Sequence, residues 1–348
     1  MRSGDNRSRI RSDIPAKTSL LASDFMESQC PSCSGTNVSV LGEYKFNVES
    51  DRHFFGSPNL SQCSQCELVF AWPMPDLTSL EEFYANIYRA KGRPHFFDLR
   101  FPPQPNERHF SYISTLSSAV NIQDIRNVLE IGPGAGEIGM LLKAANPHVK
   151  IYCIEPDLHS QEILRERGYT PTDQLSEIPH DLDLVMAFHS LEHFTSVDGF
   201  VQLFEQRIKR TGVLFLEVPN CPTEFGFLNR PYDSPHLLFF NARSLSDSLA
   251  RRGFTEIDVH TSGHTLSYEF GLGANWLKQY SSWKIDSPKP KLSIGLIARK
   301  MTPISVRKSI QGFRRSQQAA DLSDRVQHHL HNRPDAWLLR GVFTPRQI

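Results

Sequence analysis

The stretch Val128-Leu-Glu-Ile-Gly-Pro-Gly-Ala-Gly136 decides the fold of this 348-residue chain. Its first four residues are mostly apolar, as in a short buried strand, and a glycine-rich turn follows them directly. Glycines at such a turn let the backbone bend tightly and approach a ligand closely. The apolar residues beyond the turn recur at the spacing of one helix face: Ile138, Leu141, Leu142 and Ala145. The stretch therefore predicts a strand, a ligand-binding loop and the start of a helix.

Short apolar segments alternate with helical patterns on both sides of this loop. The segments expected to form strands are residues 128–131, 149–154, 182–188, 212–218, 254–260 and 292–298. Strands that alternate with helices in this way predict an α/β fold, in which a mostly parallel sheet has helices on both faces. Ligands of such sheets bind at the carboxyl ends of the strands, where the glycine loop lies.

The residues around the loop indicate which cofactor it suits, a dinucleotide or S-adenosylmethionine. A dinucleotide site needs G-x-G-x-x-G, but here the third glycine comes one residue early and Glu137 takes its place, where a carboxylate would repel a pyrophosphate. S-adenosylmethionine carries no phosphate, and its charged and polar groups suit the acidic residues present. Glu130 can balance its ammonium group directly or through water, and Glu155 can accept both ribose hydroxyls. Pro156 would shape the turn beside the adenine.

Five segments in order resemble the class I S-adenosylmethionine-dependent methyltransferases: residues 128–136, 151–157, 181–194, 212–220 and 235–254. The resemblance implies a Rossmann-like, seven-stranded and mostly parallel sheet, and transfer of the sulfonium methyl group to an acceptor. It also implies the cofactor-binding residues, which are Glu130, Gly132, Pro133, Gly134, Gly136, Glu155, Pro156, His189, Ser190 and Leu191. The alternative is a scaffold of this shape that binds a cofactor or a partner without turnover.

Two C-x-x-C pairs, Cys30/Cys33 and Cys63/Cys66, lie ahead of the methyltransferase pattern. Four thiolates in one short segment suit a tetrahedral, structural Zn²⁺ site, which has no open position for catalysis. A redox pair is less consistent with two neighbouring motifs, and disulfides are disfavoured in the cytoplasm, where thiols stay reduced. We therefore expect a small zinc-ribbon-like module.

A cysteine-rich segment ahead of this pattern resembles the sugar C-methyltransferases that act on nucleotide-linked deoxysugars. The similar stretch runs from Cys63 to Pro75 and continues with Tyr84 and Tyr88. That group has a Glu-His pair where this chain has Pro235-His236, and it usually has a further C-terminal domain. The resemblance implies a small-molecule acceptor, such as a nucleotide-linked sugar or a glycan or secondary-metabolite precursor. O-methylation of another metabolite or a lipid is the alternative activity.

Three side chains are candidates for removing a proton from the acceptor. His193 follows a predicted strand and is able to act as a general base near neutral pH, or it only supports the cofactor loop at the start of the next helix. His236 lies in an aromatic loop, where it either lines the acceptor site or simply packs. Tyr88 is the third candidate.

Composition limits the partners and the location. Lys plus Arg and Asp plus Glu both number 38, so the formal charge is zero and gives no electrostatic reason to expect nucleic acid. No apolar run approaches the roughly 20 residues that span a bilayer, and the polar N-terminal stretch has no secretory signal pattern. These features predict a cytoplasmic protein without a membrane span, and they leave the oligomeric state open.

The expected organisation has five parts: a disordered leader (1–28), the zinc-binding module (29–75), a helical linker that covers the substrate (76–122), the class I methyltransferase domain (123–300) and a helical C-terminal tail (301–348).

Overall fold

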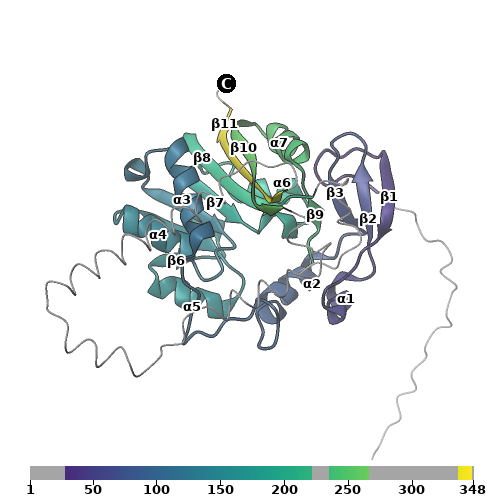
Figure 1. Ribbon diagram of the computed structural model, residues 1–348, viewed down its shortest axis with the longest axis horizontal. Helices are drawn as coiled ribbons and strands as arrows, with labels where there is room; N and C mark the ends of the chain where they lie inside the picture. The colour runs from purple at the N-terminus through teal and green to yellow at the C-terminus, as the bar shows by residue number, and fades with distance from the viewer. Residues whose placement is uncertain (1–27, 222–234, 266–335, 347–348) are drawn as a thin grey trace, which may run out of the picture.

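The computed structural model describes residues 28–221, 235–265 and 336–346, which form a seven-stranded sheet and a smaller four-stranded one (Figure 1). The large sheet has the order β10-β11-β8-β7-β4-β5-β6. Its strands are β4 (Asn127–Ile131), β5 (Lys150–Ile154), β6 (Tyr169–Pro171), β7 (Leu182–Phe188), β8 (Ile208–Pro219), β10 (Phe254–Thr265) and β11 (Ala336–Pro345). All neighbours pair in parallel except β11, which is antiparallel to both β8 and β10.

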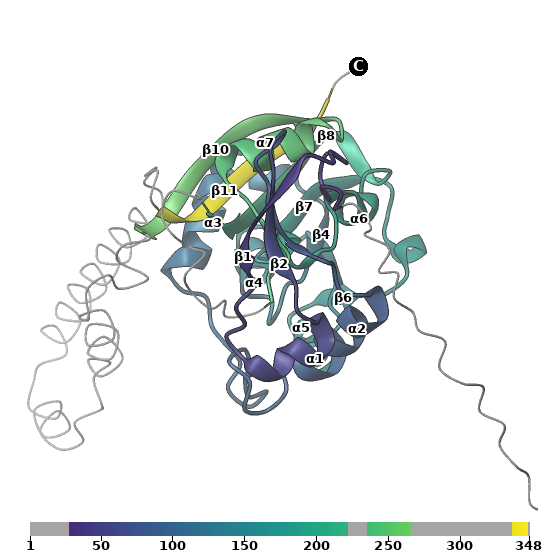
Figure 2. The ribbon, with the colours of Figure 1, turned by 90° about the vertical axis from the view of Figure 1, so that its right-hand side faces the viewer.

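Helices cover both faces of the large sheet, as the alternating pattern predicts (Figures 1 and 2). On one face, α3 (Glu107–Ala119) and α4 (Glu137–Ala145) bury Tyr112, Leu116 and Leu142 against β4, β5, β7 and β8, next to α5 (Leu158–Glu166). On the other face, α6 (Val197–Gln202) and α7 (Ala242–Ala250) bury Phe200 and Leu245. Burial on both faces explains why the central strands are almost wholly apolar.

The small sheet has the order β1-β2-β3-β9 and lies beside the large one (Figure 1). Its strands are β1 (Val38–Glu43), β2 (Asn59–Cys63), β3 (Val69–Trp72) and β9 (Leu238–Phe239), and all of them pair antiparallel. The first three come from the cysteine-rich segment, whereas β9 comes from the chain after β8. One core therefore contains residues of both sheets, including Phe70, Leu238 and Leu216.

The segment between the two sheets is largely helical. After the small helix α1 (Arg52–Phe55) in the cysteine-rich segment, the chain continues through α2 (Leu77–Glu82) into one turn of π-helix, η2 (Phe83–Ile87). Asp76 caps α2 by accepting a hydrogen bond from the amide of Ser79 at 2.9 Å. This segment delivers Tyr84 and Tyr88 toward the large sheet.

The structure near the C-terminus contradicts one prediction. A helix was expected over residues 301–348, but residues 336–345 form β11, which lies between β10 and β8. The strand predicted at residues 292–298 lies outside the described residues, as does the leader up to residue 27. The sequence pattern hid β11 because Arg340 interrupts its apolar run, although this arginine is completely buried.

Arg340 is buried because Glu217 of β8 neutralises it. Its Nη2 and Nε donate to Glu217 Oε2 at 2.8 and 3.0 Å, and both side chains are 0% exposed. Thr115 and Ser111 of α3 accept the remaining guanidinium hydrogens at 2.9 and 3.0 Å. Burial by itself would raise the pKa of Glu217, but Arg340 and the imidazole of His189 outweigh burial and hold that pKa well below its usual range.

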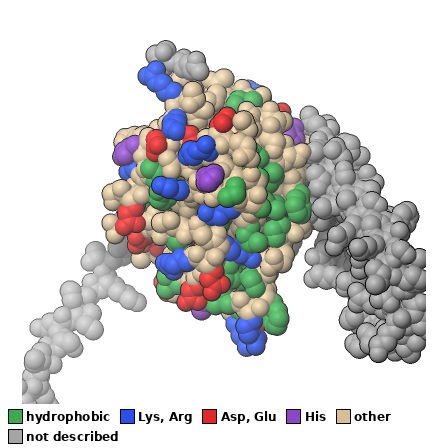
Figure 3. Space-filling model, turned by 90° about the vertical axis from the view of Figure 1, so that its left-hand side faces the viewer, with side chains coloured by type: hydrophobic (Ala, Val, Ile, Leu, Met, Phe, Trp, Pro, Cys, Tyr) green, Lys and Arg blue, Asp and Glu red, His purple; other side chains and the backbone are tan. Residues whose placement is uncertain are grey.

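Within the described residues, no helix combines the length and apolar character that a membrane crossing requires. On the molecular face shown in Figure 3, basic and acidic side chains are interspersed and do not form a patch of one sign. This distribution matches the balanced overall charge.

Replacing Arg340 with alanine should destabilise the protein by about 3–5 kcal/mol, because the substitution leaves a carboxylate buried without its main cation. Urea denaturation measures the loss. Lys209→Ala is the matched control: it removes a partly exposed ion pair with Asp183 and should cost about 1 kcal/mol or less. Equal losses for the two variants would contradict the importance of the buried pair.

Candidate functional site

The glycine loop between β4 and α4 has the backbone conformation that the sequence pattern predicts. Gly132, Gly134 and Gly136 have φ values of 66°, 60° and 81°, in the left-handed region that side chains disfavour. A Cβ on Gly132 would approach Ser190 Oγ to 2.4 Å, and one on Gly136 would lie 2.7 Å from Leu164. Glycine is thus favoured at these positions both by the backbone conformation and by the lack of space for a side chain.

Glu155 lies directly after β5, beside the loop. Its two carboxylate oxygens accept hydrogen bonds from the amides of Gly134 and Asp157, both at 3.1 Å. Burial raises the pKa of Glu155, while the charge of Arg89 and the two amides oppose that rise. The next residue, Pro156, is exposed at the turn. Since β4 and β5 are parallel neighbours, the loop and this carboxylate come together at one edge of the sheet.

Glu130 occupies a different position from Glu155. Its side chain is 1% exposed and accepts a 2.6 Å hydrogen bond from the hydroxyl of Tyr169 on β6. Burial raises the pKa of Glu130 to about 8. A contact between Glu130 and a cofactor ammonium group would therefore have to compete with Tyr169.

The residues after β7 adjoin the loop. Ser190 donates to the carbonyl oxygen of Ile131 at 2.8 Å, and Leu191 is fully buried at the start of a 3-10 turn, η5 (Leu191–His193). His189 has a φ of 53°, which is unusual for a residue other than glycine. Its ring lies between Glu217 and Glu192, with nitrogen–oxygen distances of 3.3 and 3.4 Å. Burial and Arg108 lower the pKa of His189, but the two carboxylates outweigh them and raise it.

The two candidate catalytic histidines meet next to this turn. The rings of His193 and His236 are T-shaped, with centroids 4.9 Å apart. The ligand atoms of Glu192, His193 and His236 all lie within 4.8 Å of one another. Tyr88, the third candidate, contacts His193 at a ring distance of 6.1 Å. Two distant parts of the sequence thus form one group, which we call the histidine cluster: Glu192, His193 and His236.

Backbone and side-chain contacts hold the histidine cluster in place. Leu237 donates its amide hydrogen to the carbonyl oxygen of Glu192 at 2.7 Å. Tyr44, from the cysteine-rich segment, donates to the carbonyl oxygen of His236 at 2.9 Å. Tyr84 shares a 2.8 Å hydrogen bond with Nδ1 of His193. The small sheet and the helical segment therefore build part of the site.

Electrostatics keep both imidazoles neutral. Burial and the neighbouring His193 lower the pKa of His236 to about 3, and burial likewise lowers the pKa of His193. Burial would raise the pKa of Glu192, but His189 and the other histidines lower it, so this side chain is a carboxylate. Both of its oxygens are buried without a hydrogen-bond partner in the described part of the chain. A low pKa leaves an imidazole without a proton and so able to accept one, but it also makes that imidazole a weaker base than a free one.

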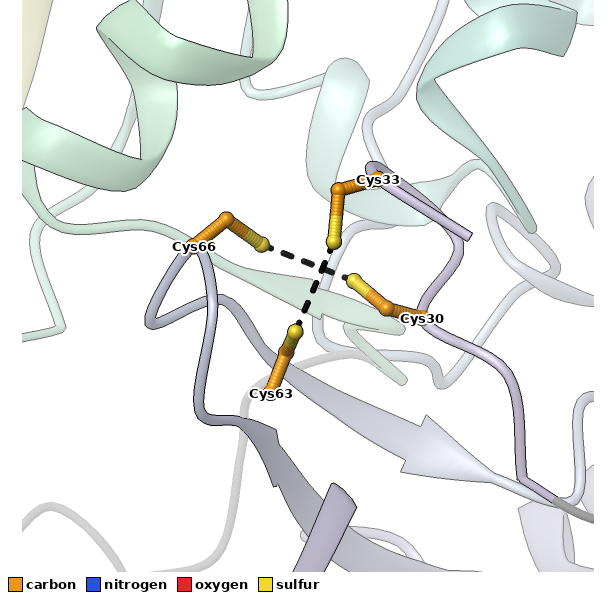
Figure 4. Close-up of side chains that lie close together, drawn as sticks. All are labelled: Cys30, Cys33, Cys63 and Cys66. Carbon is orange, nitrogen blue, oxygen red and sulfur yellow. Dashed lines mark hydrogen bonds between the residues drawn. The ribbon is translucent and has the colours of Figure 1, made fainter. Parts of the chain in front are cut away.

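The four cysteines converge as the spacing predicts (Figure 4). Their sulfur atoms all lie within 4.8 Å of one another, with 3.6 Å between Cys30 and Cys66 and 3.5 Å between Cys33 and Cys63. Each pair is followed by a residue with positive φ, Ser34 or Glu67, whose amide donates back to the first cysteine of its pair. The two knuckles thus have the same turn, and this four-sulfur donor set suits a tetrahedral Zn²⁺.

Sequence analysis missed Arg89, which follows Tyr88 and lies over the glycine loop. It belongs to no motif, so only the folded arrangement of η2 against the loop reveals it.

Comparisons with known proteins agree with this geometry. Residues 95–259 match a family model described as a methyltransferase domain. The matched residues include the glycine loop, Glu155 and the histidine cluster, and they leave out the cysteine-rich segment and β11. A search of curated protein sequences found no significant match.

Solved structures show only distant similarity. One is an S-adenosylmethionine-dependent methyltransferase from Geobacter sulfurreducens in complex with S-adenosyl-L-homocysteine (14% identity, 78% of this chain and 99% of that chain, TM-score 0.38). Another is a putative sarcosine dimethylglycine methyltransferase from Galdieria sulphuraria (12% identity, 68% and 85%, TM-score 0.42). A third is an O-methyltransferase from a Brevibacillus brevis trans-AT PKS multienzyme (11% identity, 69% and 72%, TM-score 0.40). At these scores the similarities add nothing to the family match.

The family match coincides with the strand–glycine loop–helix unit and with the acidic residue that ends the next strand. Residues 95–259 thus match a methyltransferase domain in sequence and in the local structure of the glycine loop.

Proposed function

We propose that the protein transfers the methyl group of S-adenosylmethionine to a small-molecule acceptor that binds against the histidine cluster. The observation that carries this proposal is the position of Glu155, whose carboxylate lies beside the glycine loop at the end of the neighbouring parallel strand. A carboxylate there accepts hydrogen bonds from a ribose diol, and the methionine part would lie along the neighbouring glycine loop.

The other predicted cofactor contacts follow from this pose. The backbone of Gly132, Pro133, Gly134 and Gly136 faces the methionine part, and Pro156 lies beside the adenine. His189, Ser190 and Leu191 flank the cofactor on the side of β7. The Glu130 carboxyl group already accepts a hydrogen bond from Tyr169, so it could bind the ammonium group only with its remaining acceptor sites. We therefore propose that the main role of Glu130 is to hold the glycine loop in place.

Methyl transfer itself needs little chemistry from the protein. The acceptor atom forms a bond to the methyl carbon as the bond from that carbon to sulfur breaks, and S-adenosylhomocysteine leaves with the electron pair. The positively charged sulfur already makes the methyl group electrophilic, so alignment of donor and acceptor supplies most of the rate. If the acceptor atom carries a proton, a base must remove it.

The histidine cluster supplies this base. His193 and His236 are neutral, and the nearby Glu192 carboxylate stabilises the positive charge that proton uptake creates. Tyr88, at the edge of the cluster, is the remaining candidate. An acceptor that is methylated at the carbon beside a carbonyl group must first lose a proton from that carbon, and so needs a base. Nucleotide-linked keto-sugars are therefore the acceptors that we propose first, consistent with the resemblance of residues 63–88 to sugar C-methyltransferases.

We propose that the four cysteines hold a structural Zn²⁺. Four sulfur ligands fill the coordination sphere, so the metal stabilises the small sheet and takes no part in methyl transfer. Cys66 lies three residues before the first residue of β3, and β3 pairs with β9 close to His236 in the sequence.

S-adenosylmethionine should raise the melting temperature of the protein, because a ligand that binds only the folded state stabilises it by about 2.7 kcal/mol at a hundredfold excess over Kd. Glu155→Ala should weaken cofactor binding by about tenfold or more, since it removes charge-assisted hydrogen bonds to the ribose. Calorimetry measures both affinities, with Glu162→Ala on the outer surface of α5 as the control. No binding of S-adenosylmethionine at millimolar concentration, or an unchanged affinity in the Glu155 variant, would contradict this pose.

Loss of the catalytic base should lower turnover and spare cofactor binding. His236→Asn or His193→Asn should reduce kcat by about 10²–10⁴-fold, whereas His159→Asn on α5 should have no effect. Because burial lowers the pKa of both candidate bases, the acid limb of the pH profile of kcat/KM should lie below the roughly 6.5 of a free imidazole. Full turnover of both variants on a true acceptor would exclude the two histidines and leave Tyr88.

The purified protein should contain about one zinc ion per chain, as measured by elemental analysis. Cys30→Ser and Cys66→Ser should lower both metal content and melting temperature, because metal binding and folding are coupled. Cys153→Ala, in a buried cysteine outside the group, should keep the metal. Well-folded, metal-free protein would refute the zinc assignment.

A further inference from the structure

Arg89 lies directly over the glycine loop. Its Nη2 atom is 3.0 Å from the position that a Cβ on Gly134 would occupy. The guanidinium group also lies over two aromatic rings, Tyr88 and Phe97, at 5.3 Å from each ring centroid. Such stacking holds a guanidinium in one orientation while leaving its edge free to donate hydrogen bonds.

Among the described residues, most of the hydrogen-bond donors of Arg89 have no acceptor. Its Nε is buried and has no hydrogen-bond partner in the described residues. Its Nη1 makes one long contact, 3.4 Å to the carbonyl oxygen of His95. Within the described ranges, Arg89 forms no ion pair with a carboxylate inside 4.0 Å. A guanidinium offers five N–H donors, so this one is suited to an anion with two acceptor atoms.

The surroundings of Arg89 favour one kind of anion. Burial raises the pKa of Glu155 and of Glu137, and both carboxyl groups are close enough to Arg89 for its charge to oppose that rise. These acidic groups repel a free anion but attract a cationic group. A zwitterion that presents a carboxylate to Arg89 and an ammonium group to the acidic side satisfies both charges, and the amino-acid end of S-adenosylmethionine is such a zwitterion.

We propose that Arg89 binds the α-carboxylate of the methionine part of S-adenosylmethionine. This assignment rests on the proposed function, because it assumes that the methionine part lies along the glycine loop. It also places a cofactor ligand outside the matched domain of residues 95–259, in the segment that joins the two sheets. The N-terminal part of the chain then completes the cofactor site as well as supporting the histidine cluster.

The test compares two ligands that differ only at the amino-acid end. S-adenosylhomocysteine carries the carboxylate, whereas 5′-methylthioadenosine keeps the adenosine and the sulfur but has no amino-acid group. Calorimetry with Arg89→Ala should show about 10- to 100-fold weaker binding of S-adenosylhomocysteine, the value of a charged hydrogen bond. Binding of 5′-methylthioadenosine should change by less than about twofold. Arg89→Lys, which keeps the charge without the fork, should fall between the wild type and Arg89→Ala.

Arg100→Ala is the control, because Arg100 is exposed, pairs with Asp98 and lies in the same part of the chain. An equal loss of affinity for both ligands in Arg89→Ala would show that Arg89 only holds Glu155 and the loop in place, and would overturn the proposal. Normal binding of S-adenosylhomocysteine by Arg89→Ala, together with weaker binding of UDP, would also overturn the proposal. Arg89 would then bind an anionic group of the acceptor and not the carboxylate of the cofactor. If the wild-type protein binds neither adenosine ligand, the proposed function itself fails and the assignment fails with it.

Discussion

The carboxylate of Glu217 is buried in the large sheet, and the groups that neutralise it come from distant parts of the chain. Arg340 of β11 and Ser262 of β10 donate to one oxygen, at 2.8 and 3.3 Å. Tyr112 of α3 donates to the other, which also lies 3.3 Å from Nε2 of His189. A buried carboxylate is strongly destabilising unless these partners are present. The last strand, the first long helix and the turn that carries His189 are therefore joined at a single side chain.

A series of contacts leads from this carboxylate to the cysteine site. His189 lies between Glu217 and Glu192, and the carbonyl oxygen of Glu192 accepts the amide hydrogen of Leu237. Leu237 immediately precedes β9, which pairs with β3 just beyond Cys66. The cysteine-rich segment thus lies on one side of the candidate site, and a structural metal there would hold that segment in place. This arrangement gives a physical reason for a four-cysteine module in a methyltransferase.

Local features of the site were predictable from the sequence. The glycine loop, Glu155 and the two cysteine pairs each depend on a short motif whose backbone geometry follows from its own residues. Features that depend on tertiary contacts were not predictable. Strand β11 was missed because the burial of Arg340 makes sense only once Glu217 is known to face it. The tie between Glu130 and Tyr169 was missed for the same reason, because 39 residues separate them.

The histidine cluster was predictable only in part. The position of His193 after a strand and of His236 in an aromatic loop marked both residues as candidates, but their contact depends on how β9 joins the small sheet. Arg89 carried no signal, since it comes close to Gly134 only in the folded structure, 45 residues away in the sequence.

A crystal structure of the protein with S-adenosylhomocysteine tests the central claim most directly, because it locates both ends of the cofactor. We expect the ribose hydroxyls within hydrogen-bond distance of Glu155, the amino-acid end along Gly132–Gly136, and the sulfur directed toward His193 and His236. A ligand bound away from Glu155, or a sulfur atom directed away from the histidine cluster, would contradict a methyl-transfer site between the two sheets.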